Sequence, residues 1–228
     1  MVQQLTLADS LSLGDLHTYL QRASRVEDGA VRLVAGNDIL AVYTAILYPR
    51  GILDESPTVL GLRTFQLFET DDFDIVVPMR SVVDRIVRAR GELGDDDGGD
   101  PRPVTMTRPP EVNTVTWAGI SPPRGGWRPL GETDAATLER AARAGIDEIA
   151  KAIPEGTGEQ LVQRVRSEVW GRGIDGLEYV PAGAAFAAFS LGFLGDDPIS
   201  VFETGPWTRL SSRRGHVLVR RKAWTLKA

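Results

Sequence analysis

The sequence predicts an α+β fold in which mixed, mainly antiparallel sheets are covered by four or five helices. Apolar residues recur at helical spacing in several segments, and they alternate with polar residues in several others. The β-rich segments are short and bounded by Gly, Pro, Asn and Asp, which favours hairpins. With 228 residues, of which 42% are hydrophobic and 25% charged, the chain can bury a substantial core. We therefore expect a single compact domain over residues 1–228.

The first part of the chain alternates helices and strands. Leucines at helical spacing predict a helix over residues 10–27, with Ser10 or Ser12 as its N-cap. Two β-rich runs meet at Gly36-Asn37-Asp38, and Gly and Asn accept the positive φ of a tight hairpin. The next elements expected are strands at residues 57–69 and 73–78 and a helix at residues 79–90.

The middle of the chain contains the least regular segments. Turn residues and like charges at 91–103 (GELGDDDGGDPRP) predict a flexible acidic loop, with a loosely bound divalent cation as the alternative. Residues 104–109 and 111–121 are expected to be strands. Residues 122–131, which contain three prolines and Trp127, are expected to form a loop.

The second part predicts three helices followed by three short strands. The clearest helix spans residues 133–153 and is stopped by Pro154. A second helix at 157–170 begins with Thr157 and Gln160 at capping-box spacing. An Ala-rich helix is expected at 182–194, and strands are expected at residues 199–203, 207–212 and 216–221.

Similar strings recur in the two parts of the chain. Each contains a segment ending in Val-Pro, then a helix, the string LGDD, a proline and a strand. An old duplication would explain this order and would give two similar lobes at residues 28–110 and 111–228. Coincidence is the alternative, because turns in Gly- and Pro-rich proteins converge on the same residues.

Composition excludes several classes of protein. The chain has no Cys, so disulfides, thiolate nucleophiles and Cys-based metal sites are ruled out. No signal peptide or membrane-spanning segment is evident, and we expect a cytoplasmic protein. The preference for Arg over Lys, with abundant Ala, Gly and Asp, predicts a bacterial source with a high-GC genome. The Ala-rich helix at 182–194 fits a contact in a homo-oligomer as well as it fits a core position.

Two catalytic motifs fail the test of structural context. Residues 171–176 (GRGIDG) match the dinucleotide pattern G-x-G-x-x-G, but they follow a predicted helix instead of a strand. Ser190 resembles a serine nucleophile followed by Asp196 and His216, but an Ala-rich helix, and no buried strand, precedes it. The two histidines have no metal-ligand spacing. We therefore expect no metal and no cofactor.

The charge is unevenly distributed along the chain. Residues 209–228 contain seven basic residues and no acid, whereas the rest contains 19 basic and 31 acidic residues. Arginines can gather around a phosphate or carboxylate, and the residues expected to bind such a ligand are Arg50, Arg124, Arg209, Arg213, Arg214 and His216. Alternatively, these arginines pair with the acids of the body.

Three functional hypotheses follow. A non-enzymatic binding or assembly protein comes first, because every catalytic pattern fails. A binder of a small anion, or an enzyme acting on one, is the alternative, and a serine hydrolase built on Ser190 is third. The partners expected are a small anion or an acidic protein; nucleic acid is disfavoured by the sequence pI of 5.2.

Overall fold

A computed structural model of the chain divides into two compact units. Unit 1 comprises Met1–Thr44 and Leu62–Gly119, and unit 2 comprises Ala45–Gly61 and Ile120–Ala228. The residues that the structure describes are 3–51, 54–68, 71–93, 102–112, 115–154 and 156–221.

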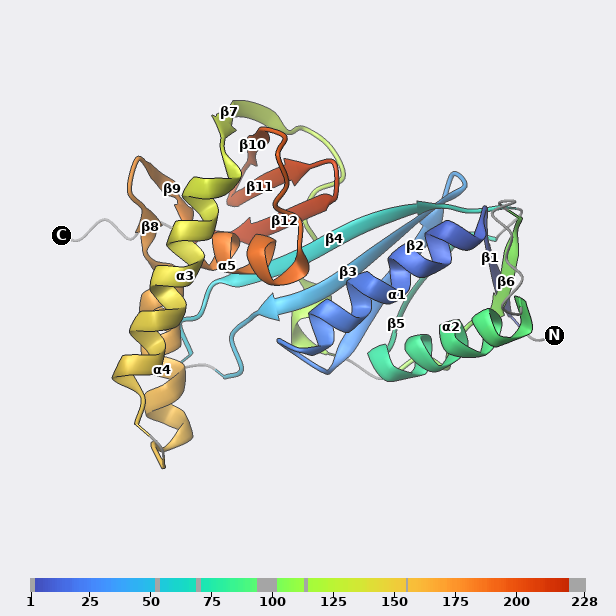
Figure 1. Cartoon of the computed structure of the whole chain (residues 1–228), viewed down its shortest axis with the longest axis horizontal. Coiled ribbons are helices and arrows are strands. Elements are labelled where there is room, and N and C mark those ends of the chain that lie inside the picture. Colours follow the sequence, from blue (N-terminus) through green and yellow to red (C-terminus); the bar gives the residue numbers. More distant parts are fainter. Residues whose placement is uncertain are drawn as a thin grey trace. The chain divides into compact units, whose positions relative to one another are not determined.

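Unit 1 is a sheet covered by two helices (Figure 1). Its elements are β1 (Gln4–Leu7), α1 (Ser10–Ser24), β2 (Ala30–Gly36), most of β3 (Ile39–Leu47), most of β4 (Thr58–Gln66), β5 (Phe73–Pro78), α2 (Met79–Leu93), β6 (Val104–Thr107) and the 3₁₀ helix η1 (Thr116–Gly119). The strand order is β5-β2-β3-β4, and β1 pairs with β6. The β2–β3, β2–β5 and β1–β6 pairs are antiparallel.

Large apolar side chains fill the space beneath α1 and α2. Leu13, Leu16 and Leu20 of α1 are almost completely buried, as is Ile86 of α2. Tyr19 is buried as well, and its hydroxyl lies 2.8 Å from the Thr44 hydroxyl. Burial raises the pKa of Tyr19, so the phenol stays protonated and its hydrogen bond is retained.

Unit 2 combines strands of the large sheet with three helices. Its elements are β7 (Arg128–Thr133), α3 (Ala135–Ala152), α4 (Glu159–Gly171), β8 (Gly173–Ile174), β9 (Leu177–Pro181), α5 (Ala182–Leu191), β10 (Ile199–Thr204), β11 (Trp207–Ser212) and β12 (Gly215–Arg220). The order is β4-β12-β11-β10-β7, and β8 pairs with β9. Strand β10 is antiparallel to both β7 and β11, and β11 is antiparallel to β12.

Small residues allow the three helices of unit 2 to approach closely. A Cβ added to Gly145 of α3 would overlap the ring of Trp170 in α4. That ring stacks on Phe186 of α5 with 4.5 Å between the ring centroids. Helix α5 also buries Ala184 and Ala188, whose short side chains leave room for the neighbouring helices.

Several predictions from the sequence are confirmed. The fold is α+β, with antiparallel strand pairs and five α-helices among the described residues. The hairpin at residues 36–38 forms, and Asn37 and Asp38 have φ of 51° and 58°, the left-handed values that its turn requires. Residues 171–176 begin at the last residue of α4 and lead into the β8–β9 hairpin, so they do not connect a strand to a helix as a dinucleotide-binding motif does.

Other local predictions are wrong. Asp9, not Ser10 or Ser12, caps α1, and Gly158 replaces the expected Thr157 cap of α4 without a side-chain hydrogen bond. Residues 116–119 form a 3₁₀ helix where a strand was expected. Strand β7 lies partly in the expected loop at 122–131, because pairing with β10 outweighs the local turn signals.

Most of the predicted acidic loop lies outside the described residues. Of residues 91–103, the structure describes 91–93, which continue α2, and 102–103. The alternative of a bound cation there concerns mainly residues outside the described part. Within the described part, no helix is long and apolar enough to cross a membrane.

Candidate functional site

A pocket of about 1200 Å³ lies within unit 2. Its walls come from the β3–β4 connection, one face of α4, the β8–β9 hairpin and the end of β12. The lining residues on α4 are Glu159, Gln160, Gln163, Arg164, Ser167, Glu168 and Gly171; those elsewhere are Arg50, Gly51, Asp54, Glu55, Pro57, Arg172, Gly173, Glu178, Tyr179, Pro181, Arg220 and Arg221. The α4 residues recur every three or four positions, so helical geometry places them on one face.

Hydrogen bonds fix two walls of the pocket. The Asp54 carboxylate accepts from the backbone N–H groups of Arg50 and Ser56, each at 2.9 Å. Partial burial acts to raise the pKa of Asp54, but the hydrogen bonds from Ser56 and Arg50 prevail and lower it. On another wall, Arg172 donates to Glu148 of α3 and to Glu168 of α4.

The residues that line the pocket carry no net charge. Five of its lining side chains are acidic and five are basic. Its volume exceeds the 300–1,000 Å³ that is usual for small-molecule sites. A segment of polypeptide with mixed charges therefore fits the pocket better than a small ion does.

Two of the predicted ligand residues lie next to each other, on β11 and β12. Arg209 sits between the rings of Trp127 and Phe202, at 4.6 and 4.5 Å from their centroids. Burial lowers the pKa of Arg209. His216 lies 3.0 Å from the Ser211 hydroxyl through Nδ1, and its pKa is lowered first by burial and then by Arg209. His216 is therefore neutral at pH 7.

The other predicted ligand residues are dispersed. Arg213 pairs with Asp197 at 3.4 Å, and Arg214 donates to the Leu194 carbonyl at 2.9 Å. Arg50 lines the pocket, whereas Arg124 lies in an exposed loop and is not among its lining residues. The six residues therefore form no single cluster.

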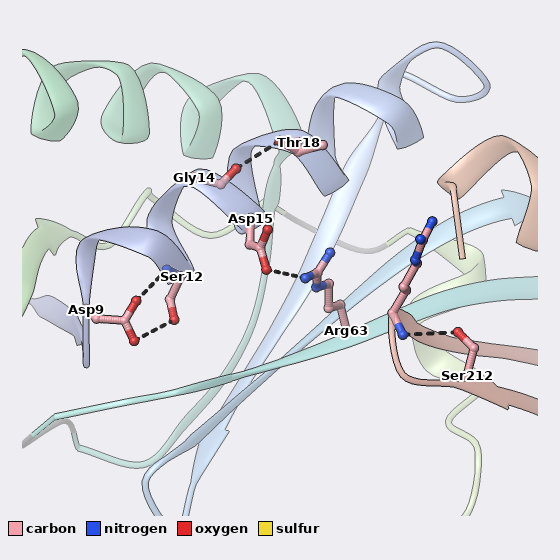
Figure 2. A network of polar contacts seen from close by, with 8 residues as sticks. Asp9, Ser12, Gly14, Asp15, Thr18, Arg63 and Ser212 are labelled. Atoms are coloured by element: carbon pink, nitrogen blue, oxygen red, sulfur yellow. Dashed lines mark hydrogen bonds and ion pairs between the residues drawn. The ribbon is translucent and has the colours of Figure 1, made fainter. Parts of the chain in front are cut away.

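The helix pair of unit 1 offers a different surface. Figure 2 shows Asp9 bonded to Ser12 at the start of α1, and Asp15 paired with Arg63 of β4. Helix α2 carries four arginines and two acids. Among these arginines, Arg80 contacts Asp28, and Arg90 contacts His17. For Arg25 and Arg88, both exposed, the described residues provide no carboxylate partner.

Metal ligands are not grouped in the described part of the chain, where no set of three or more His, Cys, Asp or Glu side chains could hold an ion. Ser190 lies within α5, so it is not at the sharp strand-to-helix turn that a nucleophile elbow requires.

Two family models match the sequence. Residues 1–106 match a domain of unknown function (DUF8010), and residues 122–224 match another domain of unknown function (DUF8185). No curated protein matches the chain.

Solved structures identify the architecture. DNA polymerase III subunit beta from Borrelia burgdorferi is similar over 100% of this chain and 67% of its own, with 8% identity and a TM-score of 0.54. The chain has a sliding-clamp fold. The DNA polymerase sliding clamp from Caulobacter crescentus is similar over 98% of this chain and 67% of its own, with 15% identity and a TM-score of 0.48. This chain therefore spans about two thirds of the length of these clamps.

This likeness corrects the functional hypotheses. The clamp fold conflicts with a small-anion binder, with an enzyme acting on such a ligand and with a serine hydrolase. The expectation of a binding or assembly protein named neither this fold nor DNA as a partner. The expectation that nucleic acid is disfavoured as a partner also conflicts with this fold. That expectation relied on the net charge of the whole chain. A DNA ligand interacts with the charges of the surface it contacts, because salt screens exposed charges that are more than about 10 Å away.

Proposed function

We propose that this chain is a clamp-like assembly protein that binds double-stranded DNA through its phosphates. The main observation in support of this proposal is the structural similarity to the Borrelia DNA polymerase III subunit beta, which extends over 100% of this chain. A protein that remains mobile on DNA needs contacts that do not depend on base sequence. Phosphate contacts from arginine meet that requirement.

The surface of α1 and α2 is the best candidate for these contacts. Arg25 follows α1 directly, and Arg88 lies on α2; both are exposed. A guanidinium without a carboxylate partner can bind a phosphate oxygen without first breaking an ion pair. In unit 2, by contrast, Arg143 is paired with Glu139, and Arg172 with Glu148.

The pocket of unit 2 suits a different partner. Because its acidic and basic side chains are equal in number, it does not favour a polyanion over other ligands. In the same proposal, we assign it to a segment of a protein partner. DNA and protein would then be bound by different units of the chain.

The predicted duplication is part of this proposal. The order β1-α1-β2-β3-β4 at the start of the chain recurs at its end as β9-α5-β10-β11-β12. Asp9 and Asp134 cap the first helix of each unit through the same two hydrogen bonds, to residues three positions on. The recurring order relates α1 to α5, and the shared cap relates α1 to α3. These parallels support a repeated strand–helix–three-strand unit, with copies at residues 4–66 and 177–220 and not at the bounds 28–110 and 111–228 expected from the sequence.

Fluorescence anisotropy with a labelled DNA duplex tests the DNA contact. The double variant Arg25→Glu with Arg88→Glu should weaken binding at least tenfold at about 50 mM salt. Two phosphate contacts would be lost, so the slope of log K against log[salt] should become shallower by about 2. The matched control, Arg124→Glu with Arg140→Glu, changes the net charge equally on exposed positions of unit 2.

The two variants separate a local contact from a general charge effect. A control that leaves affinity within about threefold of the wild type would place the contact on unit 1. If the wild type fails to bind duplex DNA even at about 50 mM salt, where phosphate contacts are strong, the proposal is wrong. Equal losses in both variants would count against the assignment to α1 and α2.

A further inference from the structure

The outer half of the α3–α4 hairpin has no buried core among its described residues. Gly145 and Val169 are buried where the hairpin leaves the rest of unit 2. Among the described residues between them, from Ile146 to Glu168, none is buried. Figure 1 shows this part of α3 and α4 extending beyond α5.

This outer half nevertheless carries branched aliphatic side chains. They are Ile146, Ile149, Ile153, Leu161, Val162 and Val165. Ile146 is 36% exposed and Leu161 is 49% exposed. Two helices can cover only one side of each other, so a hairpin of this kind keeps apolar surface in water unless a third element packs on it.

The base of the hairpin is held firmly. The Trp170 ring lies against Gly145 and stacks on Phe186 of α5. Arg172 joins the two helices through Glu148 and Glu168. The exposed apolar surface is therefore preformed, and a partner would not have to order it on binding.

We propose that the outer half of α3 binds the same surface of a second copy of this chain, with the two α3 helices antiparallel. Ile146, Ala150 and Ile153 are spaced by four and three residues, so they lie along one side of α3. Centred near Ile149, an antiparallel pair places Ile146 of each copy near Ile153 of the other. Together with α4 of each copy, the result is a four-helix arrangement.

The charges on α3 indicate that the partner bound at this surface is a second copy of the chain. Asp147 and Lys151 each follow a residue of the apolar stripe, are both exposed and flank the stripe on the same side. In the antiparallel register, Asp147 of one copy faces Lys151 of the other, and the two-fold axis repeats this pair. Acids and bases are equal in number on α3 and on α4, so two hairpins meet without net repulsion.

This inference is independent of the proposed DNA contact, because it concerns only helices of unit 2. Sedimentation velocity over a range of concentrations tests it. The wild type should dimerise with a Kd below about 1 mM. Asp147→Lys or Lys151→Asp alone should raise Kd about tenfold, since each substitution sets like charges opposite each other twice.

The charge swap gives the decisive comparison. Asp147→Lys combined with Lys151→Asp restores both pairs with reversed polarity, so Kd should return to within about threefold of the wild type. Mixing the two single variants should likewise give a heterodimer. The matched control is Asp175→Lys, which makes the same charge change on an exposed turn and should leave Kd unaltered.

Three results would overturn the inference. A wild type that remains monomeric up to about 1 mM would exclude a functional contact. A dimer whose Kd is unchanged in both single variants must use another surface. Single variants that weaken the dimer without rescue by the double swap would reveal a general loss of structure instead of a paired contact.

Discussion

The first helix of each unit is capped in the same way, yet the helices are packed differently. Asp9 and Asp134 both accept from the backbone N–H and the hydroxyl of the residue three positions later. Beyond the caps, α1 packs with long side chains such as Leu16 and Tyr19, whereas α3 packs with Ala142 and Gly145 in addition to Leu138. The cap decides where a helix begins, and the size of the buried side chains decides what can pack on it.

Within the described residues, unit 2 has one α-helix more than unit 1, and this difference in side-chain size allows that helix to pack. Large side chains fill the layer between α1, α2 and the sheet. In unit 2, Gly145 and the alanines of α5 leave space that the Trp170 ring of α4 occupies. Helix α4 in turn forms one wall of the pocket. The small residues of α3 and α5 are thus a condition for the pocket to exist.

Among the substitutions that test this difference in packing, we expect the largest effect on stability at Gly145. Gly145→Leu forces a side chain into the space of the Trp170 ring, so we expect a loss of about 3 kcal/mol in the free energy of unfolding. Denaturant unfolding followed by tryptophan fluorescence measures the loss. An unchanged midpoint would mean that α4 is not fixed by this contact.

The N-cap of α1 should have a smaller effect. Asp9→Ala removes the acceptor of the Ser12 backbone N–H, and we expect a loss of about 1 kcal/mol. Asp9→Asn retains an oxygen acceptor and serves as the control, which should lose only a fraction of this energy. If both variants unfold like the wild type in urea, the cap does not stabilise α1.

Gly14 of α1 sharpens the comparison, because it is a helical glycine that, unlike Gly145, has no close neighbour. A Cβ added at Gly14 meets nothing within 4 Å. Gly14→Ala should therefore raise the free energy of unfolding by about 0.5–1 kcal/mol through its better helix propensity. Thermal unfolding measures the gain, and a decrease would indicate a packing role for Gly14.

The smallest effect concerns the titration of His216. Because burial and then Arg209 lower its pKa, the folded state binds a proton at His216 less readily than the unfolded state, whose pKa is near 6.5. The stability contributed by neutral His216 is therefore complete above pH 6.5 and is lost as the pH falls toward its lower, folded pKa.

NMR titration of Arg209→Met tests the cause of this shift. Removing the guanidinium should raise the pKa of His216, although burial, the larger cause, should keep it below 6.5. Arg213→Met is the control, since Arg213 pairs with Asp197. No upward shift in Arg209→Met would rule out an electrostatic effect of Arg209.

The sequence predicts the local elements better than it predicts the site. Periodicity locates all five α-helices and the β10–β12 strands, and the Asn37–Asp38 turn follows from its residue types. It misses β1 and β7, whose strand character depends on pairing with β6 and β10 far along the chain. Propensity read over a short window contains no information about such partners.

The candidate site was missed for a similar reason. The predicted ligand residues came mainly from the acid-free basic run at residues 209–228; in the structure, Arg213 contacts Asp197 and Arg214 contacts the Leu194 carbonyl. The polar face of α4 was a usable signal. Glu159, Gln163 and Ser167 recur every fourth residue, and all three line the pocket.

The sequence by itself determined which segments form the α-helices and where the Asn37–Asp38 turn lies, because turn residues and apolar periodicity act over a few residues. It also predicted that the G-x-G-x-x-G string and Ser190 lack the structural context of their motifs: the string begins at the end of α4, and Ser190 lies within α5. Only the tertiary structure decided which strands pair, which arginines stay unpaired and where the pocket lies. These outcomes depend on contacts between residues far apart in the chain, whose free energies no local pattern encodes.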